Sequence, residues 1–204
     1  VPYNWTLDVA EKAKTVVSCP VATVGRVVSV EAGEKILQDG SADIIGYGRS
    51  LLTDPDIANK VASGECIREC LNCNKGCVDA IQGRRYISCV LNAENGDEET
   101  IFIKPCDTKK NVAVVGAGLA GLEAARVAAK RGHTVTVFEK TDKMGGQINI
   151  ASVPPRKSEI LRAVEYYEKI LPSMVEIKYN HEPSFDELNT YDEVILAIGA
   201  HNME

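Results

Sequence analysis

Four cysteines stand close together in the chain, at Cys70, Cys73, Cys77 and Cys89, in the pattern C-x2-C-x3-C-x11-C. Three bunched thiolates can wrap one part of a cubane, and a fourth that arrives after a loop can close it. Such crowded thiolates are typical of a 4Fe–4S cluster. A structural zinc site is the main alternative, but zinc sites usually pair their cysteines as two short knuckles separated by a longer spacer. The spacing therefore favours iron–sulfur over zinc, and buried free cysteines explain four at this density poorly.

A glycine-rich turn follows downstream, between an apolar strand at residues 111–116 and a helix. Its glycines form the pattern G-x-G-x-x-G and are Gly116, Gly118 and Gly121. The first allows a tight turn, the second lets the backbone approach a pyrophosphate, and the third lets the helix lie close to the strand. A second strand, residues 134–139, ends on Glu139, which can accept hydrogen bonds from an adenosine ribose and would repel a 2′-phosphate. This complete context predicts a dinucleotide site.

Composition narrows the partners and the compartment. The 204-residue chain has a net charge of −6 and no cluster of Lys and Arg, which argues against nucleic acid as a partner. Its apolar stretches are too short to span a bilayer, and no signal peptide is visible, so we expect no membrane association. Seven cysteines without a secretory signal favour a reducing compartment, and we expect a cytoplasmic protein. Packing is the default interpretation of the three cysteines outside the four-ligand pattern, Cys19, Cys66 and Cys106.

Hydrophobic patterning predicts a parallel α/β fold. The first part of the chain alternates between the two element types: helix 6–17, strand 20–24, helix 29–38, strand 42–47, and a helix that Asp54 caps and that runs to about residue 64. After the glycine-rich turn we expect a helix over 122–131 that Gly132 ends, an amphipathic helix over 157–171, and strands over 175–179 and 194–198.

Both early strands run into a Gly-Arg pair, Gly25-Arg26 and Gly48-Arg49. In (β/α)8 barrels a phosphate site is often built from the loops after strands seven and eight. Glycines there expose backbone N–H groups, and an arginine adds a charge-assisted contact. Each pair taken alone also fits a simple turn with a solvated charge. Two in succession, followed by a cysteine cluster, strengthen the phosphate interpretation.

The chain resembles the iron–sulfur flavoenzymes of the old yellow enzyme superfamily. The resemblance lies in the order of its motifs: the Gly-Arg strand ends come first, then the cysteines, then the glycine-rich turn. These flavoenzymes include 2,4-dienoyl-CoA reductase, 2-enoate reductase and related NADH:flavin oxidoreductases, and the cysteine spacing matches the dienoyl-CoA reductase pattern. The stretch MGGQINIASVP at residues 144–154 is similar to the family's GGQ loop, and YDEVILAIGA at residues 191–200 is similar to its later flavin-domain strand. The resemblance covers essentially the whole chain.

The resemblance implies a four-part organisation of the chain. Residues 1–64 would be the C-terminal end of a (β/α)8 barrel on the FMN side, 65–93 the iron–sulfur segment, 94–110 a linker, and 111–204 an incomplete Rossmann-like FAD/NAD(P)-binding domain. The FMN phosphate site would comprise Gly25, Arg26, Gly48 and Arg49, and the four cysteines would ligate the cluster. The FAD site would comprise Gly116, Gly118, Gly121, Glu139, Gly146, Gln147 and Gly199.

The activity that the resemblance implies is the reduction of an enoyl substrate, with electrons passing from NADH or NADPH to FAD, to the 4Fe–4S cluster and to FMN. The substrate-side residues of such enzymes would lie upstream, so we assign no catalytic residue and expect a fragment that is inactive alone. Unpaired strand edges would leave it poorly stable or paired with a second copy. Two alternatives are a nucleotide-binding module with a structural zinc and an electron-input subunit of the glutamate-synthase type, although the latter does not explain the Gly-Arg strand ends.

Overall fold

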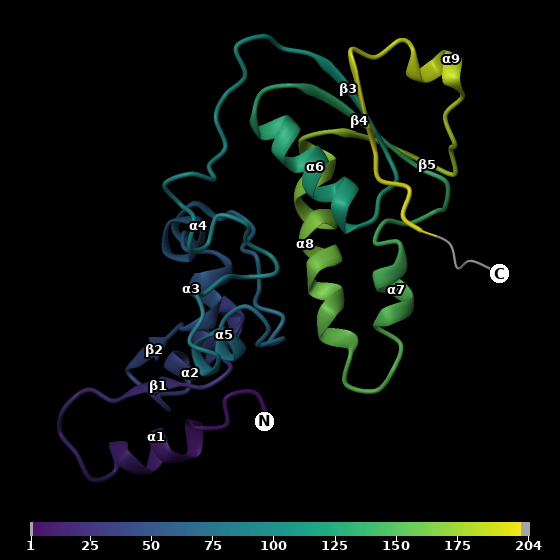
Figure 1. Ribbon diagram of the computed structural model, residues 1–204. Helices are drawn as coiled ribbons and strands as arrows, with labels where there is room; N and C mark the ends of the chain where they lie inside the picture. Colours follow the sequence, from purple (N-terminus) through teal and green to yellow (C-terminus); the bar gives the residue numbers. More distant parts are fainter. Residues whose placement is uncertain (1, 201–204) are drawn as a thin grey trace. The chain divides into compact units, whose positions relative to one another are not determined.

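The computed structural model describes residues 2–200 and separates into two compact units, Val1–Glu98 and Glu99–Glu204. Each unit combines helices with a parallel sheet, so the expected α/β class is confirmed (Figure 1). No helix within residues 2–200 combines the length and the apolar character that crossing a bilayer requires.

The first unit carries a two-stranded parallel sheet with helices around it. Its elements are α1 (Leu7–Lys14), β1 (Ala22–Val24), α2 (Val30–Gln38), β2 (Ile44–Gly46), α3 (Arg49–Thr53), α4 (Ile57–Ser63) and α5 (Val78–Gln82). In the sheet, Ala22 lies opposite Ile44 and Val24 lies opposite Gly46. The two strands therefore end at the same edge, which brings the two Gly-Arg pairs to one side of the unit. Buried residues of α1, α2 and the loops beside the strands form a small core: Ala10, Val27, Ile36 and Ala42.

Capping explains where two of these helices begin and end. The Ser29 side chain accepts a hydrogen bond from the Ala32 N–H at 3.2 Å and begins α2. Gly64 takes a left-handed conformation, with φ of 73°, directly after α4. The expectation that Asp54 caps α4 was wrong, because Asp56 is the residue before that helix and Asp54 closes α3. The Asp54 carboxylate instead accepts from Lys60 Nζ at 2.6 Å and from the Arg68 N–H at 2.9 Å.

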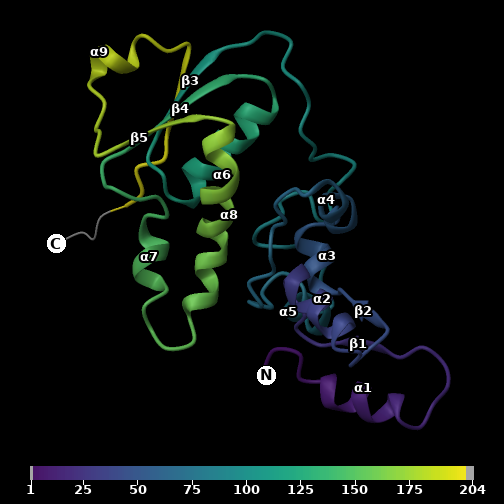
Figure 2. The ribbon, with the colours of Figure 1, turned by 180° about the vertical axis from the view of Figure 1, so that it is seen from behind.

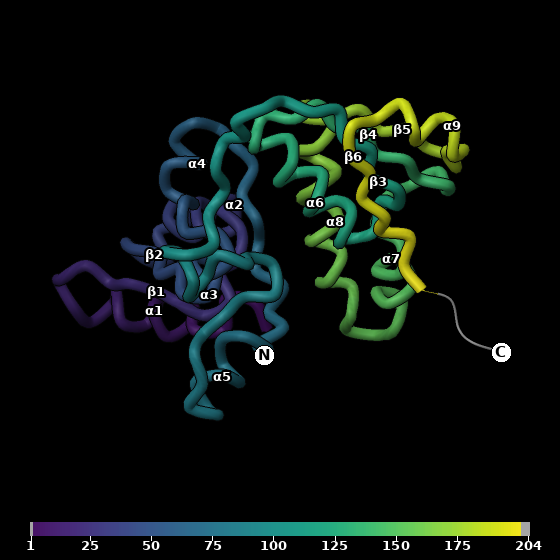
Figure 3. Tube along the Cα trace, turned by 45° about the horizontal axis from the view of Figure 1, so that its top comes forward, coloured from purple at the N-terminus to yellow at the C-terminus, as the bar shows by residue number. Residues whose placement is uncertain are grey.

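The second unit is built on a four-stranded parallel sheet in the order β5-β4-β3-β6. Its elements are β3 (Asn111–Val115), α6 (Leu119–Lys130), β4 (Thr134–Glu139), α7 (Gln147–Ala151), η1 (Ser158–Leu161), α8 (Arg162–Ile170), η2 (Leu171–Ser173), β5 (Glu176–Tyr179), α9 (Phe185–Leu188) and β6 (Glu193–Leu196). Figure 3 shows β6 beside β3, although some 80 residues separate the two strands in sequence.

The core of the second unit lies between this sheet and two helices. Val114 and Val137 on the central strands are fully buried, as are Leu122 of α6 and Leu171 after α8. Helices α6 and α8 lie side by side in both views of the ribbon (Figures 1 and 2). A hydrogen bond of 2.9 Å from the Tyr167 hydroxyl to the Glu123 carboxylate joins them. The core therefore holds the β3–α6–β4 unit in place, and with it the glycine-rich turn.

Helix α6 begins three residues before the expected start and ends one residue before the expected end. Arg131 is the C-cap after the last helical residue, Lys130, and Gly132 follows in a left-handed conformation with φ of 101°. This is the position after the cap at which glycine most often ends a helix. The prediction of Gly132 as the C-cap was therefore one residue late, because Arg131 is the cap and Gly132 follows it.

Candidate functional site

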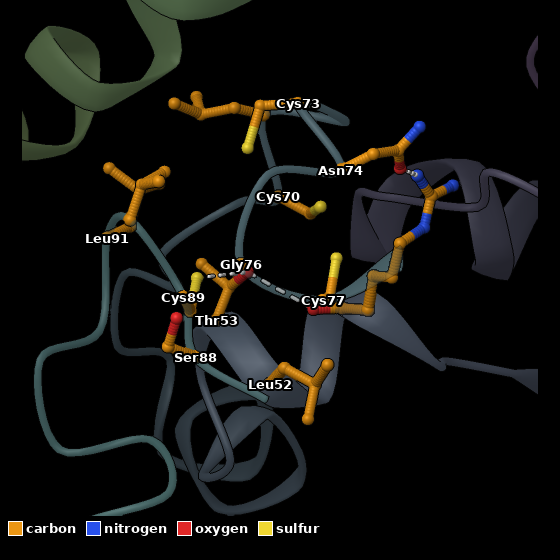
Figure 4. A pocket seen from close by; sticks show the side chains of 13 residues that line it. Leu52, Thr53, Cys70, Cys73, Asn74, Gly76, Cys77, Ser88, Cys89 and Leu91 are labelled. Carbon is orange, nitrogen blue, oxygen red and sulfur yellow. Dashed lines mark hydrogen bonds between the residues drawn. The ribbon is translucent and has the colours of Figure 1, made fainter. Parts of the chain in front are cut away.

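The four predicted ligands Cys70, Cys73, Cys77 and Cys89 line one hollow of the first unit, here called the cysteine hollow. It encloses about 330 Å³ of space, part of it open to solvent. Figure 4 shows the four side chains around this space. The structure therefore brings together all four residues that the sequence pattern grouped, even though Cys89 arrives from a separate segment.

The loop from Cys70 to Cys77 is shaped by two asparagines. Asn72 and Asn74 adopt left-handed backbone conformations, with φ of 54° and 62°. Asparagine tolerates this region better than most residues. The turn at Asn72 directs its N–H to Cys70 Sγ at 3.3 Å. Backbone N–H groups that point at cysteine sulfurs are among the features that tune iron–sulfur clusters.

A contact between Gly76 and Ser88 joins the bunched cysteines to the distant one. The Ser88 N–H donates to the Gly76 carbonyl oxygen at 2.7 Å. A Cβ at Gly76 would lie 2.3 Å from the Ser88 carbonyl oxygen, so only glycine fits there. Since Cys77 follows Gly76 and Cys89 follows Ser88, the contact sets these two cysteines beside each other. The sequence analysis missed it, and its only trace in the sequence is a glycine directly before the third cysteine.

Helix α3 forms a wall of the cysteine hollow with Arg49, Leu52 and Thr53. Arg49 Nη1 donates to Asn74 Oδ1 at 2.5 Å, and Thr53 Oγ1 lies 3.5 Å from Cys89 Sγ. The sequence analysis did not predict this helix, because a single turn is too short to show a hydrophobic period. It therefore missed Thr53 as well.

The environment of Cys70 resists loss of its proton in the absence of a ligand. Burial raises the pKa of the Cys70 thiol, while the Asn72 N–H, the Arg49 charge and the Thr53 hydroxyl act in the opposite direction. A cysteine becomes a metal ligand only as a thiolate. The groups that oppose burial are those that would stabilise the thiolate once a metal is bound.

The glycine-rich turn of the second unit has two crowded glycines and an open one. A Cβ at Gly116 would lie 2.4 Å from the Ala197 carbonyl oxygen, and one at Gly121 would lie 1.9 Å from the Gly116 carbonyl oxygen. At Gly118, a Cβ would have no atom of the described residues within 4 Å. Gly116 and Gly121 are therefore required by the fold itself, whereas Gly118 borders space that a ligand can enter.

Glu139 is held firmly beside this turn, at the carboxyl end of β4. It is 7 % exposed. One carboxylate oxygen accepts from the Ala117 N–H at 2.9 Å, and the other accepts from the N–H and the hydroxyl of Thr141, each at 2.8 Å. Burial by itself would raise the pKa of Glu139, but these hydrogen bonds outweigh it and bring the pKa below its ordinary value. The side chain is therefore a fixed negative charge, and a carboxylate retains acceptor capacity beyond these bonds.

The predicted GGQ loop packs against the same turn. The Gly145 N–H donates to the Ala117 carbonyl oxygen at 2.8 Å, and a Cβ at Gly146 would lie 3.3 Å from Gly118 Cα. Gln147 Nε2 donates to the carbonyl oxygen of Ala200, the residue after Gly199, at 3.2 Å. The predicted FAD-site residues of the second unit thus gather around the glycine-rich turn.

The two Gly-Arg pairs follow β1 and β2 at one edge of the small sheet, but their arginines are engaged differently. Gly25 and Arg26 both have positive φ, of 138° and 58°, and the Arg26 guanidinium lies 4.4 Å from the centre of the Tyr3 ring. The Arg49 guanidinium contacts the cysteine loop through Asn74. The shared edge agrees with a common phosphate site, and the role of each residue there stays a prediction.

Comparisons with known proteins agree with both halves of this description. The model of the NADH:flavin oxidoreductase / NADH oxidase family matches residues 3–66, and that of an NAD(P)-binding Rossmann-like domain matches residues 114–170. A bilirubin reductase of Mediterraneibacter gnavus is 48% identical over 99% of this chain and 32% of its own length. A cinnamate reductase of Clostridium sporogenes is 39% identical over 98% of this chain and 30% of its own length.

Among solved structures, a 2-naphthoyl-CoA reductase superimposes with a TM-score of 0.94 at 29% identity, over 100% of this chain and 32% of that one. The chain belongs to the old-yellow-enzyme-like NADH:flavin oxidoreductase family. It spans about a third of the length of these relatives. The two Gly-Arg pairs fall inside the matched stretch 3–66, and Gly116 to Glu139 fall inside 114–170. The cysteines lie between the two matched stretches.

The donor set of the cysteine hollow is suited to a cluster of several metal atoms. Within residues 2–200, no group of three or more His, Cys, Asp and Glu side chains is placed to hold a metal ion. Zinc needs four sulfurs about 2.3 Å from one point. A cubane instead takes one thiolate at each of four separate corners. Four cysteines that line one hollow, with an N–H directed at one sulfur, are donors that a cubane would take.

Proposed function

We propose that this chain is the electron-transferring part of an NAD(P)H-dependent iron–sulfur flavin oxidoreductase that reduces a carbon–carbon double bond of an enoyl substrate. The observation that carries the proposal is the convergence of Cys70, Cys73, Cys77 and Cys89 on one hollow. The same chain carries a family match that includes the Gly-Arg strand ends and a separate match that includes the glycine-rich turn. The names of three relatives add support, since bilirubin, cinnamate and 2-naphthoyl-CoA all contain conjugated double bonds.

Each group of residues has one task in this proposal. The four cysteines hold a 4Fe–4S cluster, and Gly116, Gly118 and Glu139 hold the adenosine and pyrophosphate portion of FAD. The backbone at Gly25 and Gly48, with Arg26 and Arg49, holds the FMN phosphate. When bound, these groups would supply a relay of electrons from NAD(P)H through FAD and the cluster to FMN and the enoyl substrate.

In the second unit, the residues act by position and charge. The open face at Gly118 admits the pyrophosphate to the start of α6, whose free N–H groups favour an anion. Glu139 accepts from the ribose hydroxyls, and its negative charge disfavours a 2′-phosphate. Gly146 and Gln147 close the turn from the other side. We include a cytoplasmic location and pairing of two copies in the proposal, on the basis of the cysteine content and the open strand edges.

The test is the cofactor content of the gene product at its native length, purified without oxygen. We expect about four irons per chain, broad absorption near 400 nm, and both FAD and FMN. Mass spectrometry of metals and chromatography of released flavins give these numbers directly. Addition of NADH or NADPH should bleach the flavin bands, and an enoyl compound such as cinnamate should restore them.

Two other outcomes would identify the alternatives. Stoichiometric zinc without iron, after anaerobic reconstitution, would overturn the proposal in favour of a nucleotide-binding module with a structural zinc. Iron and FAD without any FMN would favour an electron-input subunit of the glutamate-synthase type. Full cofactor content without reduction of any enoyl compound would overturn the substrate class alone.

A further inference from the structure

Helix α3 meets the cysteine segment along one face. Arg49 and Thr53 are four residues apart, which places both side chains on that face. Arg49 reaches Asn74 in the cysteine loop, and Thr53 reaches Cys89 on its far side. The Leu52 carbonyl oxygen accepts from Asn92 Nδ2 at 3.0 Å, which ties the helix to the chain after Cys89. One turn of helix therefore contacts both segments that supply the ligands.

The Thr53 hydroxyl has one proton and three acceptors around it, namely the Arg49 carbonyl oxygen, Cys89 Sγ and the Cys70 thiol whose pKa it lowers. It donates to the Arg49 carbonyl oxygen at 3.1 Å and lies 3.5 Å from Cys89 Sγ. A metal-bound Cys89 is a thiolate without a proton, so between these two groups only the hydroxyl can donate. Thr53 is 2% exposed, so water cannot easily supply a substitute donor. A charged ligand sulfur is a stronger acceptor than the Arg49 carbonyl oxygen.

The Arg49 guanidinium is held over the same region by Asn74, at 2.5 Å. Asn74 keeps its unusual backbone conformation, with φ of 62°, between Cys73 and Cys77. The positive charge is therefore attached to the loop that carries three of the four cysteines. This position goes beyond a role in phosphate binding, which does not require a contact with that loop.

We propose that Thr53 and Arg49 of α3 set the reduction potential of the cluster in the cysteine hollow, Thr53 by donating to Cys89 and Arg49 by its charge. The inference rests on the proposed function, because it assumes a cluster on these cysteines. Reduction adds one electron, supplied by the NAD(P)H-reduced flavin, and forms or breaks no bond. A hydrogen bond to a ligand sulfur and a nearby positive charge both favour the more negative, reduced state. Removal of either one therefore lowers the potential.

The first test is a potentiometric titration of the native-length holoprotein, followed by the EPR signal of the reduced cluster. Thr53→Val keeps the shape of the side chain and removes the donor, and Thr53→Ser keeps the donor. We expect Thr53→Val to lower the ratio of reduced to oxidised cluster at a fixed potential about tenfold, which is about 59 mV for one electron. Thr53→Ser should titrate close to the wild type. Thr53→Ala replaces Thr53→Val if that variant does not assemble the cluster.

The second test compares two arginines that carry the same charge. Arg49→Gln should lower the potential, whereas Arg84→Gln should leave it unchanged, because Arg84 is exposed to water outside the hollow. The EPR signal reports the cluster directly, so a loss of FMN in Arg49→Gln does not hide the result. Equal shifts in the two variants would overturn the role of Arg49.

The outcomes separate this inference from the proposed function. If the wild type assembles no iron–sulfur cluster, the proposed function fails and the inference fails with it. If the wild type holds the cluster and Thr53→Val has the wild-type potential, or if Thr53→Ser shifts as far as Thr53→Val, the role of Thr53 is overturned and the proposed function stands.

Discussion

The Ser88 N–H donates to the Gly76 carbonyl oxygen at 2.7 Å, and this contact sets Cys77 beside Cys89. Eleven residues lie between those two cysteines, among them α5 and the exposed turn after it. A backbone hydrogen bond thus joins the returning chain to the cysteine loop. The close approach explains why the residue before the third cysteine is a glycine.

Gly76→Ala should therefore damage the cysteine hollow. The new Cβ would lie 2.3 Å from the Ser88 carbonyl oxygen, a backbone atom that cannot move alone. We expect a loss of about 1–3 kcal/mol of stability, the usual cost of overpacking, and a fall in iron content. Gly83→Ala is the matched control, because its Cβ would meet mainly the flexible Arg85 side chain and the Asp79 carbonyl oxygen at 3.1 Å. Equal iron content in the two variants would contradict this account.

Cys73→Ser should remove the cluster, and Cys19→Ser should leave it in place. Both cysteines are exposed in the structure, so neither change creates a core cavity. Only Cys73 lines the cysteine hollow. The measurement is iron per chain after anaerobic reconstitution, together with absorption near 400 nm. Retention of about four irons by Cys73→Ser would show that this residue is not a ligand.

Gly118→Val should abolish FAD binding at a small cost to the fold, because Gly118 is the N-cap of α6 and valine is a poor residue there. Gly118 has an ordinary φ of −73°, and a side chain there would meet no atom of residues 2–200 within 4 Å of its Cβ. A β-carbon at this position therefore enters space that a ligand can occupy. We expect an FAD-free protein of the native length that is less stable than the FAD-free wild type by about 1 kcal/mol, the typical cost of losing a good N-cap residue. Normal FAD content would show that the glycine serves the fold alone.

Gly121→Ala should differ from Gly118→Val, since its main effect should be to destabilise the fold itself. The two variants are therefore compared with each other. Its Cβ would lie 1.9 Å from the Gly116 carbonyl oxygen, so α6 must move away from β3. We expect a loss of about 1–3 kcal/mol of stability even without FAD, measured as a lower midpoint of urea unfolding. A midpoint equal to that of the wild type would mean that the helix adjusts freely.

Elements and sites that depend on a local pattern of residues could be predicted from the sequence. The strand 134–139 was predicted with the bounds that β4 has. Threonine and valine alternate over residues 134–137 and Phe138 follows, which is typical of a strand. The four cysteines and the glycine-rich turn were found because each pattern is local. The parallel pairing of β1 with β2 agrees with the predicted parallel α/β fold.

The parts that were missed depend on tertiary contacts or on very short elements. Helices α3, α5, α7 and α9 have four or five residues each, which is too few to show a repeat of 3.6 residues. The contact between Gly76 and Ser88 and the attachment of Arg49 to Asn74 join segments whose separation the sequence does not reveal. The expectation that Asp54 caps α4 failed because its carboxylate is buried, at 4% exposure, and accepts from Lys60 and the Arg68 N–H instead.

Glu139→Gln should lower the stability of the second unit at neutral pH and reduce its sensitivity to acid. Three donors converge on the carboxylate, and an amide offers one oxygen and places its NH2 group against the remaining donors. We expect a loss of about 1–3 kcal/mol at pH 7 from the broken hydrogen bonds. The folded-state pKa of Glu139 is below its ordinary value of 4.5, so its contribution is fully present above that value. It is lost as the pH falls through the folded pKa.

The difference between the wild type and Glu139→Gln should therefore be large at pH 7 and shrink as the pH falls below 4.5, because the wild-type carboxyl then binds a proton as well. Urea unfolding at a series of pH values measures it. Glu187→Gln is the matched control, since the pKa of Glu187 is also lowered, first by its hydrogen bond to His181, but this carboxylate lies away from the glycine-rich turn. Only Glu139→Gln should also weaken the binding of ADP. A pH-independent difference for Glu139→Gln would show that the carboxylate is not ionised in the folded protein, and that the ribose contact proposed for it lacks its charge.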